Sequence, residues 1–254
     1  MLAWRGSGAS GAWVVFIGSA ALAALALHLI WRQSAFGVGV AALLVGLAFS
    51  RWRTRRKVER LLRSGDVRGV LRRWSISSGS LPNAGTMAPL MTATAFAAYG
   101  WIARARDALA NAERGPAWEA ALEHRLFLDA MLCAFEGDLD TAVERAESLQ
   151  RLPVPPAAPK LVERIRTLRG AVLALARAFA HESKAGDREL LLDASSASPL
   201  VHWAMRYAAA IAAVDAGEVG EAARLLEQAP EWPEESCFAR FHREIGDEIR
   251  RRGD

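Results

Sequence analysis

The chain has 254 residues, of which 52% are hydrophobic and only 8% aromatic, and it carries a formal net charge of +4. This length accommodates one domain of ordinary size beside a membrane segment and excludes two large domains. The charge divides into +2 for residues 1–50, +8 for residues 51–73 and −6 for the rest. Because the basic excess lies outside the acidic main part of the chain, the composition argues against nucleic acid as a partner.

A first membrane span is predicted after an N-terminal segment of residues 1–12. Trp13 and Trp31 enclose the uncharged run VVFIGSAALAALALHLI. A helix of this length, at ~1.5 Å per residue, nearly crosses a hydrocarbon core of ~30 Å. His28 lies near the end of this run, where its ring can reach the interface.

A second span follows over residues 31–52 and contains the run AFGVGVAALLVGLAFS. The connector between the two runs is only residues 32–34, so the spans are expected to form a tight antiparallel hairpin over residues 13–52. Small residues spaced four apart in both runs favour close packing of the two helices. We expect tryptophans to anchor the hairpin at the membrane interfaces, namely Trp13, Trp31 and Trp52.

A basic block directly after the second run sets the orientation. Its first part consists of Arg51, Arg53, Arg55, Arg56 and Lys57. Positive residues beside a span stay on the cytoplasmic side, which predicts an inner-membrane protein with both termini in the cytoplasm and a basic surface able to contact anionic lipid. The alternative is that residues 1–26 are a cleavable signal peptide, although their apolar run exceeds the usual length.

The rest of the sequence is typical of an all-α protein, with apolar residues at helical spacing between short Gly, Pro, Asp and Ser breaks. The spacing predicts basic juxtamembrane helices and a linker over 53–86 and a helical domain over 87–254, with the most flexible part of the linker at 75–85. The predicted helices cover residues 54–63, 67–77, 87–98, 101–113, 116–136, 139–151, 158–183, 199–216, 219–229 and 234–251.

A recurrent pattern of small residues marks helical hairpins. Each unit has Ala in a first helix, Gly seven residues later at the turn, and Ala five residues further in a second helix. The three units consist of Ala93, Gly100 and Ala105, of Ala130, Gly137 and Ala142, and of Ala210, Gly217 and Ala222. The segment from His124 to Pro153 resembles a tetratricopeptide repeat, which implies a short, irregular stack of helical hairpins. Gly65 and Gly186 are flanked by residues that depart from this pattern.

The order of two spans, a basic stretch and helical repeats is also similar to the N-terminal region of HemY-type membrane proteins linked to haem biosynthesis. The three-residue connector between the spans departs from that family.

At the other end of the chain, the last predicted helix has an apolar stripe and closes with arginines. The stripe consists of Phe238, Phe241, Ile245 and Ile249. We expect this helix to cap the exposed end of the stack.

No pattern of catalytic, metal-binding or cofactor-binding residues is found in the sequence, and we expect no enzyme activity. Cys133 and Cys237 are far apart and are expected to be buried, reduced thiols. Single histidines are expected on helix surfaces or in packing positions, at His124, His181, His202 and His242. Pairs of acidic residues, at 138 and 140 and at 234 and 235, fit helix capping.

The function predicted from this pattern is that of a noncatalytic, membrane-anchored adaptor or scaffold that binds a partner protein through its helical domain. We expect four tryptophans to pack in the core, and the alternative is that they line a groove for a partner. They are Trp101, Trp118, Trp203 and Trp232. The alternative function is an accessory subunit of a membrane transport, secretion or biosynthesis complex that acts through its transmembrane hairpin. No small-molecule substrate is indicated.

Overall fold

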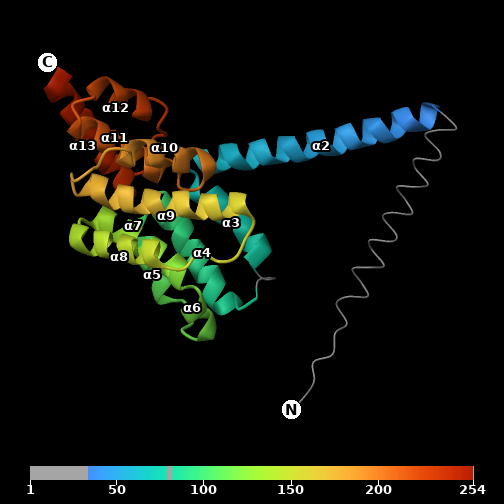
Figure 1. Ribbon diagram of the computed structural model, residues 1–254, viewed down its shortest axis with the longest axis horizontal. Helices are drawn as coiled ribbons and strands as arrows, with labels where there is room; N and C mark the ends of the chain where they lie inside the picture. Colours follow the sequence, from blue (N-terminus) through green and yellow to red (C-terminus); the bar gives the residue numbers. More distant parts are fainter. Residues whose placement is uncertain (1–33, 79–81, 254) are drawn as a thin grey trace, which may run out of the picture. The chain divides into compact units, whose positions relative to one another are not determined.

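The computed structural model of the chain describes residues 34–78 and 82–253, with side chains over 43–74 and 82–252. Within these ranges every regular element is a helix (Figure 1). The helices are α2 Ser34–Arg63, α3 Val67–Ser78, α4 Ala84–Ala98, α5 Ile102–Ala110, α6 Pro116–Ala120, α7 Leu122–Glu136, α8 Leu139–Arg151, α9 Pro159–Phe179, α10 Asp187–Ala197, α11 His202–Asp215, α12 Val219–Leu226 and α13 Cys237–Gly253. The first predicted span, with Trp13, His28 and Trp31, lies outside the described residues.

The chain divides into two units, one ending at Val58 and the other formed by Glu59–Asp254. In the first unit, α2 is a continuous helix from Ser34 and contains most of the second predicted span. No helix in the described part of the chain is both long and apolar enough to cross a membrane.

In the second unit, most helices pack against their neighbours in the sequence. The pairs α4 and α5, α7 and α8, α9 and α10, and α11 and α12 form successive hairpins, and α8 also contacts α9 as α10 contacts α11. In addition, α7 contacts α9, α9 contacts α11 and α11 contacts α13, and α4 contacts both α7 and α11. The second unit is therefore a set of helical hairpins in which the first and the fourth hairpin also contact each other.

Three of the hairpin turns share one backbone motif. A glycine one or two residues after each first helix has a positive φ, of 74° at Gly100, 87° at Gly137 and 79° at Gly217. At Gly137 the amide donates to Ala134 O at 3.3 Å and the next amide donates to Cys133 O at 2.9 Å. The same two hydrogen bonds occur at the other two glycines, and together they form a Schellman motif that satisfies the last helix carbonyls.

The six alanines of the small-residue pattern all lie in the core. Ala93, Ala105, Ala130, Ala142, Ala210 and Ala222 each have an exposed fraction of 0%. A larger side chain at these positions would push the two helices of a hairpin apart, because protein interiors are close-packed.

A fourth hairpin turn of the same kind has histidine where the other three have glycine. His181 follows α9 with φ 56°. Its amide donates to Ala178 O at 3.1 Å, and the Glu182 amide donates to Arg177 O at 2.8 Å. The sequence pattern based on glycine therefore missed this turn.

Helix α13 packs on α11 and α12 and closes the aromatic core. Phe238 has an exposed fraction of 0%, and its ring centroid lies 4.9 Å from that of Tyr207 and 5.5 Å from that of Phe135. At the start of α13, the Cys237 amide donates to Gly100 O at 2.9 Å, and Ser236 Oγ donates to Tyr99 O at 2.7 Å. The last helix thus packs on the fourth hairpin and is also fixed to the turn of the first.

Three helices differ clearly from the prediction: one was missed, one is divided and one is joined to the helix before it. The sequence did not predict α10, whose Asp and Ser residues have low helix propensity; its buried face, with Leu191 and Ala194, packs between α9 and α11. The predicted helix 116–136 is divided at Ala121 into α6 and α7. The predicted helix 54–63 is the end of α2, because no Gly or Pro interrupts the chain between Trp52 and Arg63 and Thr54 Oγ1 donates back to Ser50 O within the helix.

Candidate functional site

A largely apolar cavity of about 410 Å³ lies in the second unit between α4, α7, α8, α9 and the α10–α11 loop. We name it the α4–α9 groove, and it is lined by Thr94, Glu123, His124, Phe127, Leu149, Ile165, Leu168, Arg169, Ser198, Leu200 and Val201. Apolar side chains form most of its surface and polar groups are few, which is the usual composition of a binding pocket.

One of the few polar groups in the groove is the ring of His124. Thr94 Oγ1 donates to Leu90 O at 2.8 Å, and the His124 Nε2 atom lies 2.6 Å from Thr94 Oγ1. Since the threonine has used its only hydrogen, Nε2 carries the proton of this contact. Burial lowers the pKa of His124, so the ring is neutral near pH 7 and its Nδ1 is an acceptor. Within the described residues, Nδ1 has no hydrogen-bond partner.

Arg169 forms one wall of the groove and holds two helices and a loop together. Its side chain is 5% exposed, and its Nε donates to Glu123 Oε1 at 2.9 Å. Its Nη1 donates to Leu152 O at 2.6 Å and its Nη2 to Pro153 O at 3.4 Å. All three nitrogens are thus occupied, so Arg169 fixes the shape of the wall and is not a free cation for a ligand.

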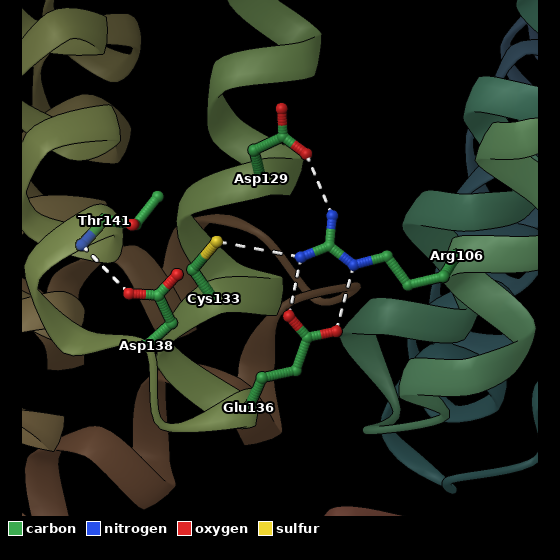
Figure 2. Close-up of polar contacts among 6 residues, drawn as sticks. All are labelled: Arg106, Asp129, Cys133, Glu136, Asp138 and Thr141. Atoms are coloured by element: carbon green, nitrogen blue, oxygen red, sulfur yellow. Dashed lines mark hydrogen bonds and ion pairs between the residues drawn. The ribbon is translucent and has the colours of Figure 1, made fainter.

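A polar cluster outside the groove joins α5 to α7 (Figure 2). The guanidinium of Arg106 forms a two-pronged pair with Glu136, with Nε to Oε1 at 2.9 Å and Nη2 to Oε2 at 2.6 Å. It also lies 3.3 Å from Asp129 Oδ1 and 3.7 Å from Cys133 Sγ. The hydrogen bonds to Glu136 raise the pKa of Arg106. In the same view, Asp138 accepts from the Thr141 amide at 3.4 Å and caps α8.

A larger hollow, of about 510 Å³, lies beside α13 at the ends of α7, α9 and α11. Charged residues of α13 line it, and Glu248 pairs there with Arg251 at 3.0 Å and Arg252 at 2.6 Å. Arg252 Nη1 also donates to Val214 O at 2.5 Å. These groups already satisfy one another, so we take the α4–α9 groove as the better candidate for binding.

The tryptophans that could have lined a groove do not line this one. Trp203 and Trp101 are in the core, with exposed fractions of 4% and 9%, whereas Trp118 and Trp232 are half-buried. Trp203 Nε1 donates to Arg63 O at 2.7 Å and Trp232 Nε1 to Tyr207 Oη at 2.8 Å. Sequence analysis also missed the role of His124 in the groove, because a single histidine on a helix gives no signal of its surroundings.

The predicted basic residues lie on the exposed part of α2. Trp52 is 47% exposed, and the guanidinium carbon of Arg56 lies 4.1 Å from its ring centroid. Arg51, Arg53, Arg55, Arg56 and Lys57 are all exposed. The side chains of the second predicted span are described only from Leu43 onward.

Both cysteines are free thiols, Cys133 buried and Cys237 half-buried. Burial raises the pKa of Cys133, partly offset by Arg106, and raises the pKa of Cys237 to about 12. Neither thiol is therefore activated for chemistry. Over the described ranges, no three or more His, Cys, Asp or Glu side chains are grouped so that they could hold a metal ion.

Comparison of the chain with protein-family models, curated protein sequences and solved structures gives no match. The function is therefore argued from the geometry of the groove and from the surface of α2.

Proposed function

We propose that the protein is a noncatalytic, membrane-anchored adaptor whose helical domain binds a segment of a partner protein in the α4–α9 groove. The observation that carries this proposal is the groove itself, a largely apolar cavity of about 410 Å³ with the ring of His124 in its lining. The α4–α5, α7–α8 and α11–α12 hairpins resemble tetratricopeptide repeats in their Ala-Gly-Ala spacing and in their shared turn, and stacked hairpins present extended grooves for partner segments.

The chemistry of the groove favours a particular partner segment. Phe127, Leu168 and Leu200 offer apolar surface, so apolar side chains of the partner gain from burial there. Nδ1 of His124 requires an N–H or O–H donor, because burying it without one carries a penalty of about 1–3 kcal/mol. The proposed partner segment is therefore apolar and carries a hydrogen-bond donor opposite His124.

The anchor completes the proposed mechanism. A hairpin in the inner membrane, with both termini in the cytoplasm, confines the helical domain to the membrane surface. Confinement raises the effective concentration of a bound partner next to other membrane proteins. An accessory membrane subunit stays the alternative, because the exposed apolar side chains of α2, such as Leu44 and Leu47, could pack against other membrane helices.

The proposal is tested by site-specific photocrosslinking of the full-length protein in its native membrane. A photoreactive residue replaces Ile165 or Leu168 in the groove, and the control position is Glu163, which is exposed on the same helix and does not line the groove. We expect one adduct from both groove positions and none from the control. The adduct should persist when the hairpin is replaced by an unrelated two-span anchor.

Equal crosslinking from Glu163, or no adduct from either groove position, would contradict the adaptor function. Loss of the adduct only after the anchor is replaced would favour the accessory-subunit alternative.

A further inference from the structure

The polarity of α2 changes along the helix axis and not around it. Every described side chain from Leu43 to Lys57 is exposed. From Leu43 to Phe49 the large side chains are apolar, with exposed fractions between 53% and 68%, at Leu43, Leu44, Val45, Leu47 and Phe49. From Arg51 to Lys57 most side chains are basic. We call residues 43–49 the apolar collar of α2 and residues 51–57 its basic collar.

Each collar extends around the whole helix. Successive residues are turned by about 100°, so apolar residues at 43, 44, 45, 47 and 49 point in all directions, as do the basic residues at 51, 53, 55, 56 and 57. A helix that lies flat on a membrane has one apolar face and one charged face along its length. The pattern in α2 instead fits a helix that enters an apolar layer end-on, with its charges at the boundary.

The boundary between the two collars carries aromatic rings paired with guanidinium groups. The Arg56 guanidinium carbon lies 4.1 Å from the Trp52 ring centroid, and that of Arg53 lies 5.9 Å from the ring centroid of Phe49. The Phe49 and Trp52 ring centroids are 5.6 Å apart. Tryptophan prefers the headgroup level of a bilayer, and arginine there faces lipid phosphates. These pairs therefore mark the depth at which the helix crosses the headgroup layer.

From this geometry we propose that α2 inserts end-on into a bilayer containing anionic lipid, with the apolar collar in the hydrocarbon and the basic collar bound to lipid phosphates. This inference rests on the proposed membrane anchoring and adds its depth, its direction and its lipid class. The basic collar has five cations and no acid between residues 51 and 57, so its charge complements an anionic headgroup layer. Nucleic acid would leave the adjoining apolar collar in water.

The direction of insertion is tested with nitroxide labels on single added cysteines in the full-length protein reconstituted into vesicles. Labels are placed at Leu43, Leu44, Val45, Leu47 and Thr54, and the unmodified protein is the blank, because burial raises the pKa of both native thiols. We expect oxygen accessibility to rise steadily from Thr54 to Leu43. A periodic profile around the helix, or water-like accessibility at every position, would overturn the end-on geometry.

The lipid class is tested by synthesising the full-length protein in the presence of vesicles and measuring flotation as a function of lipid concentration. Vesicles consist of phosphatidylcholine alone or with added phosphatidylglycerol. We expect tighter binding with phosphatidylglycerol, and the triple variant R53Q/R55Q/R56Q should need roughly a hundredfold more of this lipid, since each cation contributes about 1 kcal/mol.

The matched control is R68Q/R166Q/R243Q, which removes the same charge from exposed positions of the second unit. It should bind as the unmodified protein does. Equal binding to both kinds of vesicle, or an equal loss in the control, would overturn the role of the basic collar while leaving membrane anchoring intact. Failure to float with either kind of vesicle would overturn the anchoring as well.

Discussion

Helix α11 and the Leu43–Phe49 part of α2 are built from similar apolar residues but have opposite surroundings. In α11 all residues from His202 to Val214 except Arg206 are buried, because α9, α10, α12 and α13 cover it. In α2 the five large apolar side chains are more than half exposed. Apolar composition thus predicts a helix in both places, but only packing shows whether the chain itself supplies the contact. For the apolar side chains of α2, no covering contact is seen among the described residues, and we propose that the bilayer covers them.

The largest loss of stability is expected for a substitution at Phe238. The side chain is fully buried among Phe135, Tyr207 and Trp232, so Phe238→Ala should lower the free energy of unfolding by about 3–5 kcal/mol. Phe49→Ala in α2 should change it by less than about 0.5 kcal/mol. Thermal unfolding of the full-length protein in detergent measures both. Similar losses from the two variants would mean that α2 also packs on the protein.

The next effect concerns pH and two histidines of the second unit, of which His202 is buried and His124 is half-buried. Burial lowers the pKa of both His124 and His202, so the unfolded chain binds protons first as the pH falls below about 6.5. Their contribution to stability is complete above this pH and decreases below it, by at most about 1.4 kcal/mol per pH unit for each histidine.

The double variant H124Q/H202N should therefore show a flatter dependence of melting temperature on pH between about pH 7.5 and pH 5. Both substitutions keep an N–H donor, toward Thr94 and toward Ser195 O. An unchanged slope in this range would show that other groups control the acid sensitivity.

A smaller loss is expected at the cluster between α5 and α7. Arg106→Gln removes the two-pronged pair with Glu136 and should lower the free energy of unfolding by about 1 kcal/mol, since the side chain is 38% exposed. Arg151→Gln breaks only an exposed pair with Glu147 and should cost less than about 0.5 kcal/mol. Chemical denaturation of each variant compares the two, and a larger loss at Arg151 would contradict this ranking.

A pair of effects of similar size separates a turn from a helix. Gly137→Ala places a side chain at φ 87° and should destabilise the protein by about 1 kcal/mol. Gly220→Ala is the matched control, because Gly220 lies exposed within α12, and it should stabilise by about 0.5 kcal/mol. Neither position has another atom within 4 Å of the added carbon. Changes of the same sign would show that the left-handed turn does not decide the difference.

Much of the second unit could be predicted from the sequence because its signals are local. Gly137 and Asp138 mark a helix end and a cap, and Phe238 and Phe241 mark the buried face of the last helix. Helix α10 could not be predicted, because contacts with α9 and α11 stabilise it. The turn at His181 also gave no signal, since its geometry usually favours glycine.

The candidate groove could not be predicted from the sequence, for a different reason. Its walls come from residues as far apart as Thr94 and Val201, and no short motif connects them. The acceptor at His124 depends on a threonine thirty positions away that donates its only hydrogen to a helix carbonyl. Such a network is a property of the packed hairpins.

The most direct test of the account is alkaline carbonate extraction of membranes that contain the full-length protein. We predict that the protein stays in the membrane pellet, because the apolar collar of α2 lies in the hydrocarbon layer. Release into the supernatant, together with peripheral membrane proteins, would contradict the central claim that the bilayer covers the exposed apolar part of α2.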